Sequence, residues 1–228
     1  MEKRLKKIVI DGNSVVSRVR PQDGESYSIL LGNCLSHEIA NISRGHKLIG
    51  ESSRSIDSYL IHHPDVVILN FGINELCSRS MSLGLYKYLY FKTKRSNVGH
   101  FIEGGIKYFE SKFRSTLVNL RFRRSWYRFK RFERAHDELL DNLLKYSKAH
   151  IICIGVNVPS QRIEEQLPGS VKRVEKWNKR LNSKYKELNR VSILLTDDID
   201  RGNIPDGIHF DKVGHEILYN RILRIIND

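Results

Sequence analysis

The stretch KKIVIDGNS (residues 6–14) joins a short apolar run to a small polar turn, and similar runs recur along the chain. These runs are apolar throughout rather than alternating, which is typical of strands buried on both faces of a parallel sheet. The sequence predicts five such strands, which end at Ile10, Ile49, Phe71, Val156 and Thr196. The opening stretch is therefore expected to form the first strand of a parallel sheet.

Helical patterns separate the predicted strands. Strand and helix alternate along the whole chain, which indicates βαβ units with right-handed crossovers. We therefore predict an α/β fold, a three-layer α/β/α sandwich around a five-stranded parallel sheet, formed as one domain by residues 1–228. The predicted helices cover residues 27–42, 53–61, 106–117, 125–148, 171–189 and 212–226.

The composition is that of a globular protein, with 40% hydrophobic and 29% charged residues. Cys34, Cys77 and Cys153 lie far apart without a C-x-x-C spacing, which favours a reducing compartment over a disulfide framework. Neither a signal peptide nor an apolar run of about 20 residues is visible, so a cytoplasmic protein is expected. The histidines lack the spacing of a zinc site, and no metal is predicted.

The positive charge is concentrated in one segment. Residues 86–134 contain 14 basic and 3 acidic residues, which gives +11 of the formal net charge of +13. This segment lies within the long interval between the third and fourth predicted strands. We predict a basic, mostly helical insertion at about residues 81–134.

Residues 120–134, LRFRRSWYRFKRFER, interleave basic and aromatic side chains. On one continuous helix, Phe122, Trp126 and Phe129 would form an apolar stripe surrounded by arginines. Packing of this helix on the domain with a solvated basic face is one interpretation. The others are an anionic saccharide or capsule polymer, the phosphates of acyl-CoA, an anionic membrane surface, a biosynthetic partner or nucleic acid. Nucleic acid is less favoured because none of its sequence motifs is present. The weak candidates for substrate contacts here are Arg121, Arg124 and Arg128.

Polar residues follow the predicted strands, where parallel sheets bind their ligands. Ser14 follows the first strand, and a serine becomes a nucleophile when a base takes its proton. Asn74 follows the third strand, and its amide could donate to an oxyanion. Asp206 stands three positions before His209, after the fifth strand, where a carboxylate can orient an imidazole base. Each signal is weak alone, but all fall on one edge of the sheet.

Four blocks of the sequence resemble those of the SGNH hydrolase superfamily, also called the GDSL esterases and lipases. The resemblance implies a flavodoxin-like sheet, no metal and acyl transfer through a serine ester. The blocks are IVIDGNSVV (8–16), IGESSRSIDSYL (49–60), PDVVILNFGINE (64–75) and PDGIHFDKVGHEIL (205–218).

The resemblance implies catalytic roles for three side chains. Ser14 would be the nucleophile, His209 its general base and Asp206 the carboxylate that orients His209. Asn13 stands where the family usually has aspartate, which leaves the turn intact but removes a charge; we count Asn13 as a further weak candidate for a substrate contact.

The resemblance also implies an oxyanion hole. Its donors would be the Ser14 N–H, the Gly50 N–H and the Asn74 side chain. The stretch SRGHKLIGES offers Gly45 as the alternative glycine, and Gly50 is preferred because it ends the predicted second strand.

The run GINELCSRSMS (72–82) further resembles a subgroup of cytosolic SGNH proteins associated with bacterial surface-polysaccharide synthesis. We therefore predict acyl transfer through Ser14 on O-acyl groups, expected to be acetyl, of a carbohydrate or polysaccharide. Water as acceptor makes an esterase, and a sugar hydroxyl makes an O-acetyltransferase with acetyl-CoA as co-substrate; no cofactor is required. The alternative is a basic protein on an SGNH-like scaffold that binds nucleic acid or an anionic polymer. Peripheral attachment at the inner face of the membrane stays open, as does the oligomeric state.

Overall fold

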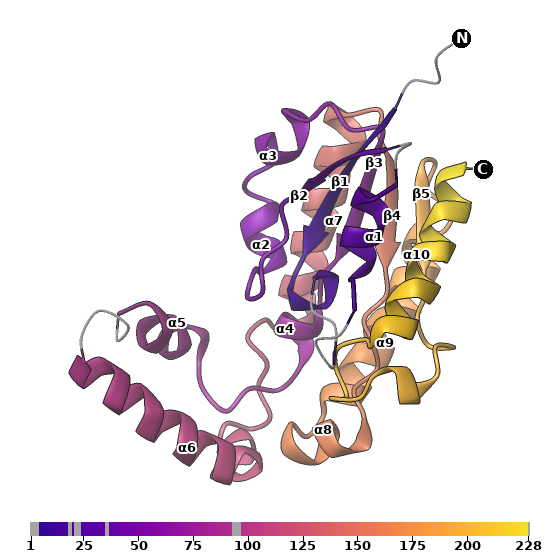
Figure 1. The fold of residues 1–228 in the computed structure, drawn as a ribbon. Helices are drawn as coiled ribbons and strands as arrows, with labels where there is room; N and C mark the ends of the chain where they lie inside the picture. The colour runs from indigo at the N-terminus through magenta and orange to yellow at the C-terminus, as the bar shows by residue number, and fades with distance from the viewer. Residues whose placement is uncertain (1–4, 18–19, 21–23, 35–36, 93–96, 228) are drawn as a thin grey trace.

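The centre of the protein is a sheet of five parallel strands in the order β2-β1-β3-β4-β5 (Figure 1). The computed structural model describes residues 5–17, 20, 24–34, 37–92 and 97–227, without the side chains of residues 90–103 and 107. The parallel sheet predicted from the sequence is confirmed, and its strand order is flavodoxin-like. The strands are β1 (Lys6–Gly12), β2 (His37–Asn41), β3 (Val66–Asn70), β4 (His150–Ile154) and β5 (Val191–Leu194).

Helices cover both faces of the sheet, as the predicted three-layer sandwich requires. On one face α1 (Tyr27–Gly32) packs against α10 (Lys212–Asn227). The other face carries α2 (Ile49–Ser52), α3 (Asp57–Leu60), α7 (Phe129–Tyr146) and α9 (Ser170–Tyr185), with α2 packed against α7 (Figure 1). All five residues of β3 are buried, which explains why that strand is apolar throughout.

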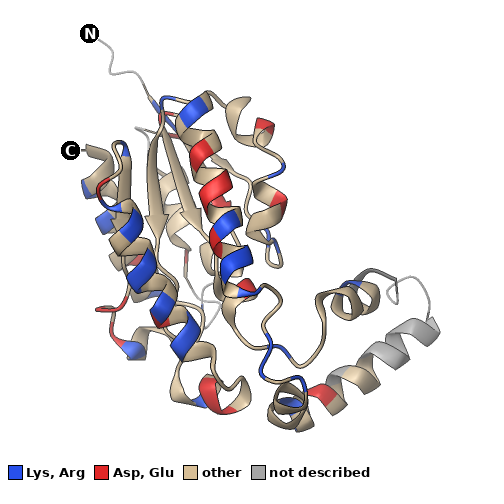
Figure 2. Cartoon of the chain, turned by 180° about the vertical axis from the view of Figure 1, so that it is seen from behind, with Lys and Arg blue, Asp and Glu red and all other residues tan. Residues whose placement is uncertain are grey.

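The outer helices are amphipathic, and their apolar sides form the core. In α7 the buried positions include Phe132, Leu139 and Leu143, which recur at helical spacing. The ring of Phe132 meets that of Trp177 in α9 edge to face, with ring centroids 4.6 Å apart. The opposite sides of α7 and α9 carry rows of charged residues that face away from the sheet (Figure 2).

The second strand is not where the sequence placed it. The predicted strand ending at Ile49 is wrong, because residues 49–52 form α2 and the strand is β2, residues 37–41. The predicted helix over residues 27–42 is correspondingly too long and stops at Gly32. β2 lies at the edge of the sheet and is only partly buried, so it lacks the continuous apolar run of the inner strands.

The long interval between β3 and β4 contains α4 (Ile73–Leu76), α5 (Leu83–Lys92) and α6 (Asn97–Leu120). α5 and α6 project from the sandwich, and α6 packs on α8 (Gln161–Gln166) (Figure 1). Because α7 begins at Phe129 and lies against the sheet, the part of the insertion that projects from the sandwich ends before residue 134, the boundary expected from the sequence. Among the described residues no helix is both long and apolar enough to cross a lipid bilayer.

The continuous helix predicted across residues 120–134 is wrong. α6 ends at Leu120, and a loop reaches Phe129, where α7 begins. Phe122 lies in this loop with φ 54°, and its side chain is 81% exposed, so it does not form an apolar stripe with Trp126. Four basic residues counted above, Lys92, Lys94, Arg95 and Lys107, lie outside the described side chains.

The end of β1 leads to a testable prediction. A Cβ at Gly12 would overlap the Asn70 carbonyl oxygen and approach Val16 Cγ2 to 2.6 Å. We expect Gly12→Ala to lower the free energy of unfolding by about 1–3 kcal/mol, as overpacking does. In Gly32→Ala, the matched control, the new methyl meets no atom within 4 Å. Urea unfolding of both variants tests this, and equal midpoints would contradict it.

Candidate active site

Ser14 stands at the carboxyl end of β1, in the first turn of the short helix η1 (Ser14–Val16). The preceding residue, Asn13, caps that turn: its side-chain oxygen accepts a hydrogen bond from Val15 N at 3.3 Å. Asn13 is buried, and its backbone N–H bonds to Asn70 O at the end of β3. Asn13 therefore holds the turn in place, and the structure does not bring it to the position of a substrate contact.

Asp206 and His209 are joined by a tight turn before α10. One Asp206 carboxylate oxygen accepts hydrogen bonds from the backbone N–H groups of Ile208 and His209, at 2.9 and 2.7 Å. Gly207 permits this turn with φ 80°, a conformation that costs other residues energy. The turn leaves the second carboxylate oxygen directed at the His209 ring.

A chain of hydrogen bonds links this turn to the end of β1. Asp206 Oδ2 lies 2.7 Å from His209 Nδ1, and His209 Nε2 lies 2.9 Å from Ser14 Oγ. Burial by itself raises the pKa of the Asp206 carboxyl, but hydrogen bonds from the His209 side chain and backbone outweigh it and hold that pKa below its ordinary value. Arg20 Nε, 3.5 Å from Asp206 Oδ2, adds a cation beside the carboxylate. Such an arrangement can fix the imidazole tautomer and let Nε2 accept the serine proton.

The glycine beside Ser14 is Gly45 and not Gly50. Gly45 lies in the loop between β2 and α2, lines the same cavity as Ser14, and its carbonyl accepts a hydrogen bond from Asn74 Nδ2 at 3.2 Å. Gly50 lies inside α2, where a Cβ would come within 2.6 Å of the Tyr127 hydroxyl. The preference for Gly50 failed because it depended on the misplaced second strand.

Arg79 fixes the orientation of Asn74. Its guanidinium donates to the Asn74 backbone carbonyl at 3.0 Å and to Asn74 Oδ1 at 3.3 Å. A guanidinium only donates, so it favours the amide orientation in which Oδ1 faces Arg79 and Nδ2 faces the Gly45 loop. Arg79 is packed in turn on the Trp126 ring, 4.3 Å from its centroid, and burial lowers the pKa of the guanidinium from its ordinary value.

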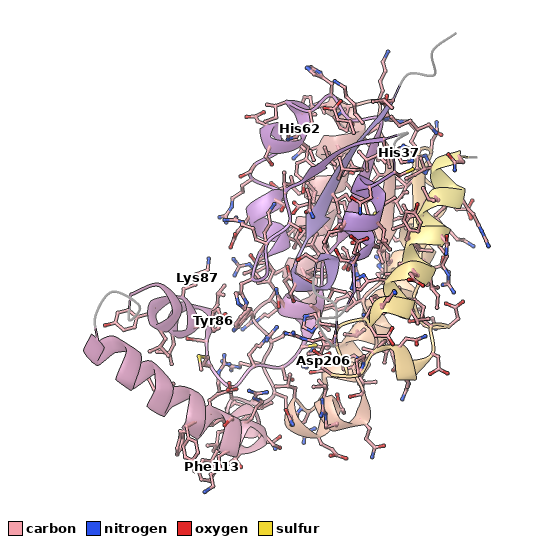
Figure 3. The ribbon with its side chains drawn as sticks, in the orientation of Figure 1. His37, His62, Tyr86, Lys87, Phe113 and Asp206 are labelled. Carbon is pink, nitrogen blue, oxygen red and sulfur yellow. The ribbon has the colours of Figure 1, made fainter. Side chains whose placement is uncertain are left out.

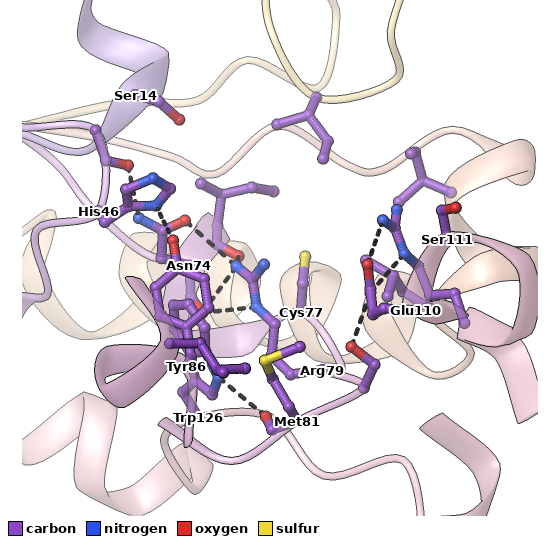
Figure 4. A pocket seen from close by; sticks show the side chains of 18 of the residues that line it. Ser14, His46, Asn74, Cys77, Arg79, Met81, Tyr86, Glu110, Ser111 and Trp126 are labelled. Atoms are coloured by element: carbon purple, nitrogen blue, oxygen red, sulfur yellow. Dashed lines mark hydrogen bonds and ion pairs between the residues drawn. The ribbon is translucent and has the colours of Figure 1, made fainter. Parts of the chain in front are cut away.

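A cavity of about 560 Å³ opens beside Ser14 and His209 (Figure 4). Its inner end is formed by the residues at the strand ends, and the projecting helices supply much of its wall. On one side the Tyr86 ring packs on Trp126 with centroids 4.7 Å apart, and the Tyr86 hydroxyl bonds to His46. On the other side Arg114 and Glu110 form an ion pair at 2.8 Å. Tyr86 points from α5 toward the sandwich (Figure 3).

Sequence reasoning missed most of this wall. Arg79 had a signal, since it follows Asn74 by five residues within the run GINELCSRSMS (72–82). Tyr86, Glu110 and Arg114 had none, because only the fold of α5 and α6 brings them to the cavity. The three arginines proposed instead, Arg121, Arg124 and Arg128, do not line it.

The geometry agrees with the comparison to known families. Residues 19–222 match the family of GDSL-like lipases and acylhydrolases. The chain belongs to this family. The GDSL family resemblance derived from the four blocks is thus confirmed, and with it the prediction of an enzyme of this class. Because the match begins after Ser14, the placement of that residue depends on the geometry described above.

Solved structures of GDSL-type enzymes share the fold. A lipase/acylhydrolase from Enterococcus faecalis has a TM-score of 0.57 and 15% identity, covering 97% of this chain and 95% of that one. The C-terminal catalytic domain of peptidoglycan O-acetyltransferase A from Streptococcus pneumoniae has a TM-score of 0.54 and 11% identity, covering 97% and 92%. A carbohydrate acetylesterase family member from Sinorhizobium meliloti has a TM-score of 0.53 and 10% identity, covering 97% of each. No curated protein matches the sequence significantly.

In the part of the chain that the structure describes, no three His, Cys, Asp or Glu side chains gather so as to hold a metal ion. The site around Ser14 contains groups that can accept or donate protons. They are a hydroxyl, an imidazole, a carboxylate and amide donors, which together suit acyl transfer.

The contact of Arg79 with Asn74 can be tested by Arg79→Met, which keeps the length of the side chain and removes the guanidinium. If Asn74 donates to an oxyanion, we expect kcat for an acetyl ester to fall about 10²-fold, as when one such donor is lost, with a smaller change in KM. Arg128→Met, in an exposed side chain outside the cavity, is the control. Wild-type kcat in Arg79→Met would show that Asn74 does not need this partner.

Proposed function

We propose that this protein catalyses acyl transfer through Ser14, acting on O-acetyl groups of a carbohydrate. The observation that carries the proposal is the hydrogen-bonded chain from Asp206 through His209 to Ser14, at the inner end of the cavity.

In the first half of the reaction Ser14 Oγ attacks the carbonyl carbon of the ester while His209 Nε2 takes the hydroxyl proton. The negative charge on the carbonyl oxygen is stabilised by the N–H groups of Ser14 and Gly45 and by Asn74 Nδ2. Asp206 stabilises the imidazolium that has formed. The tetrahedral intermediate then expels the leaving group, which receives the proton from His209, and an acetyl ester of Ser14 remains.

In the second half an acceptor hydroxyl gives its proton to His209 and attacks the acetyl-Ser14 carbonyl. The tetrahedral intermediate then breaks its bond to Ser14 Oγ, which takes the proton back from His209. Water as acceptor releases acetate, which makes the protein an esterase. A sugar hydroxyl gives an acetylated sugar, which makes it an O-acetyltransferase with acetyl-CoA as donor. The residues are the same in both cases, because only the second attacking oxygen differs.

A carbohydrate substrate is supported by the cavity and by the structural neighbours. The cavity combines aromatic rings of Tyr86 and Trp126 with the polar pair Glu110 and Arg114, so it offers both apolar surface and hydrogen-bonding groups to a sugar. Two proteins of similar fold are named as a peptidoglycan O-acetyltransferase and a member of a carbohydrate acetylesterase family. A role in bacterial surface-polysaccharide synthesis and a cytoplasmic location belong to the same proposal. The free thiols of Cys34, Cys77 and Cys153 agree with that location.

Replacement of the nucleophile tests the mechanism. We expect Ser14→Ala to lower kcat for a chromogenic acetyl ester on the order of 10⁴-fold or more, because no acyl-enzyme can form. The control is Ser58→Ala, a partly buried serine on α3 whose hydroxyl donates to Ser55 O. Mass spectrometry of the quenched wild-type reaction should show acetyl on Ser14. Full activity of Ser14→Ala would refute the mechanism.

A second experiment distinguishes the two acceptors. Purified protein is mixed with acetyl-CoA, with and without a candidate glycan, and both free thiol and glycan mass are followed. Thiol release that requires glycan and a gain of one acetyl group identify a transferase. Loss of acetyl from an acetylated glycan, without any use of acetyl-CoA, identifies an esterase.

A further inference from the structure

The side of α6 that faces away from the sandwich carries large apolar residues in contact with solvent. Tyr108 and Phe109 are 68% and 53% exposed, Phe113 is 41% exposed, and Leu120 at the end of the helix is 71% exposed. The rings of Phe109 and Phe113 lie against each other with centroids 4.7 Å apart. Figure 3 shows Phe113 on the far side of α6 from the sheet. We call Tyr108, Phe109, Lys112, Phe113 and Leu120 the outer face of α6.

The helical repeat separates this face from the cavity. Tyr108 and Lys112 stand four positions apart, as do Phe109 and Phe113, which places the two pairs on neighbouring stripes of the helix up to Phe113. α6 is kinked at Phe113, where φ is −114° and ψ is 21°, so Leu120 is assigned to the outer face by its exposure and not by the helical repeat. The opposite side of the helix carries Glu110 and Arg114, which line the cavity, and Val118, which is fully buried. One side of α6 therefore packs on the protein and lines the cavity, and a second side carries apolar residues that are in contact with solvent.

Positive charges lie within the outer face and beyond its C-terminal end. Lys112 lies within it, and the exposed Arg123 and Arg124 follow Leu120 in the loop before α7. Arg124 lies over the Phe122 ring, 5.8 Å from its centroid, and Phe122 is 81% exposed. Among the described side chains of α6 the acid is Glu110, which is on the other side and paired with Arg114. The whole segment from residue 86 to residue 134 has a net charge of +11.

We propose that the outer face of α6, with the loop that follows it, attaches the protein to an anionic lipid surface. Aromatic and leucine side chains on one face of a helix, bordered by Lys and Arg, are what an interfacial helix inserts among lipid headgroups. Apolar burial and attraction to anionic lipid add to each other in this arrangement. The surface lies apart from Ser14 and His209, so attachment does not depend on the acyl-transfer function proposed above.

Charge decides against the other occupants of this face. A second copy of the chain would bring two segments of +11 together, and the like charges would oppose association. Nucleic acid is usually held in a groove whose cations follow the phosphates, with aromatics stacked on bases. Here the apolar side chains lie along a projecting helix, with Lys112 among them and Arg123 and Arg124 beyond its end. An anionic lipid surface has an apolar layer beneath its negatively charged headgroups, which matches both the apolar side chains and the cations.

Co-sedimentation with lipid vesicles tests the proposal. The full chain should bind vesicles of phosphatidylcholine mixed with phosphatidylglycerol, bind vesicles of phosphatidylcholine alone much less, and lose binding as salt is raised. Phe109→Ser combined with Phe113→Ser should weaken partitioning at least about tenfold. The control is Ile61→Ser, which replaces a 68% exposed side chain on the far side of the molecule. All of these side chains are exposed, so the unfolding midpoints should stay unchanged.

The basic border is tested separately. Replacing Arg123 and Arg124 by Gln should weaken binding to the mixed vesicles about fivefold per arginine. Replacing the exposed Lys172 and Lys179 of α9 by Gln removes the same charge elsewhere and should have a much smaller effect. Ser14→Ala should bind vesicles like the wild-type protein, whether or not Ser14 proves to be the nucleophile.

Three results would overturn the proposal. The first is sedimentation that does not distinguish the two kinds of vesicle. The second is a dimer, detected by analytical ultracentrifugation, that Phe109→Ser with Phe113→Ser converts to monomer, because the face would then be covered by a second copy. The third is binding of single-stranded nucleic acid, without binding to anionic vesicles, that the arginine replacements abolish.

Discussion

The carboxylate of Asp11 holds together the part of the fold on which the site depends. Asp11 is fully buried near the end of β1, and its oxygens accept hydrogen bonds from Lys47 Nζ at 2.7 Å, from Ser52 Oγ at 2.7 Å and from the Tyr59 hydroxyl. Removing one partner of such a buried ion pair typically costs about 3–5 kcal/mol, so the segment from Lys47 to Tyr59 is fixed against β1. Because Gly45 precedes Lys47 by two residues, the same interaction positions the Gly45 loop beside the serine turn.

A second buried acid connects this arrangement to the segment before α7. Glu75 accepts hydrogen bonds from Ile49 N at 2.7 Å and from Gly72 N at 3.2 Å, and its carbonyl accepts one from Tyr127 N. Burial raises the pKa of the Glu75 carboxyl to about 7, although these backbone donors lower it. The Tyr127 side chain then fills the space over Gly50. The hydrogen bonds of Glu75 therefore connect the end of β3, the start of α2 and the segment before α7.

The predictability of the fold from sequence follows from burial. β1, β3 and β4 could be located because inner parallel strands are apolar on both faces, and α9 and α10 because each buries one side. The edge strand β5 could be located because its residues VSIL are mostly apolar. The other edge strand, β2, could not, since its residues HEIAN are more polar and only partly buried, while Leu48 and Ile49 form an apolar pair for a different reason, packing at the start of α2. The misplaced second strand led to the choice of Gly50 over Gly45 as a donor of the oxyanion hole. A Cβ at Gly50 would lie 2.6 Å from the Tyr127 hydroxyl, so packing alone gives a reason for glycine at this position.

The residues of the site also fall into those that could be predicted from the sequence and those that could not. Ser14, Asn74, Asp206 and His209 could be placed together because Ser14 and Asn74 closely follow β1 and β3, Asp206 and His209 lie in the segment between β5 and α10, and the carboxyl ends of parallel strands lie at one edge of the sheet. The cavity wall could not be predicted, because its side chains come from helices whose positions depend on contacts distant in sequence, such as Arg79 on Trp126. Short local blocks of sequence thus specify the side chains suited to acyl transfer, and the insertion between β3 and β4 specifies much of the cavity beside them. Since Ser14 and His209 are themselves almost completely buried, an acceptor has to reach them through that space. Under the proposed acyl-transfer mechanism, the insertion and not the strand ends would therefore select water or a sugar hydroxyl as acceptor.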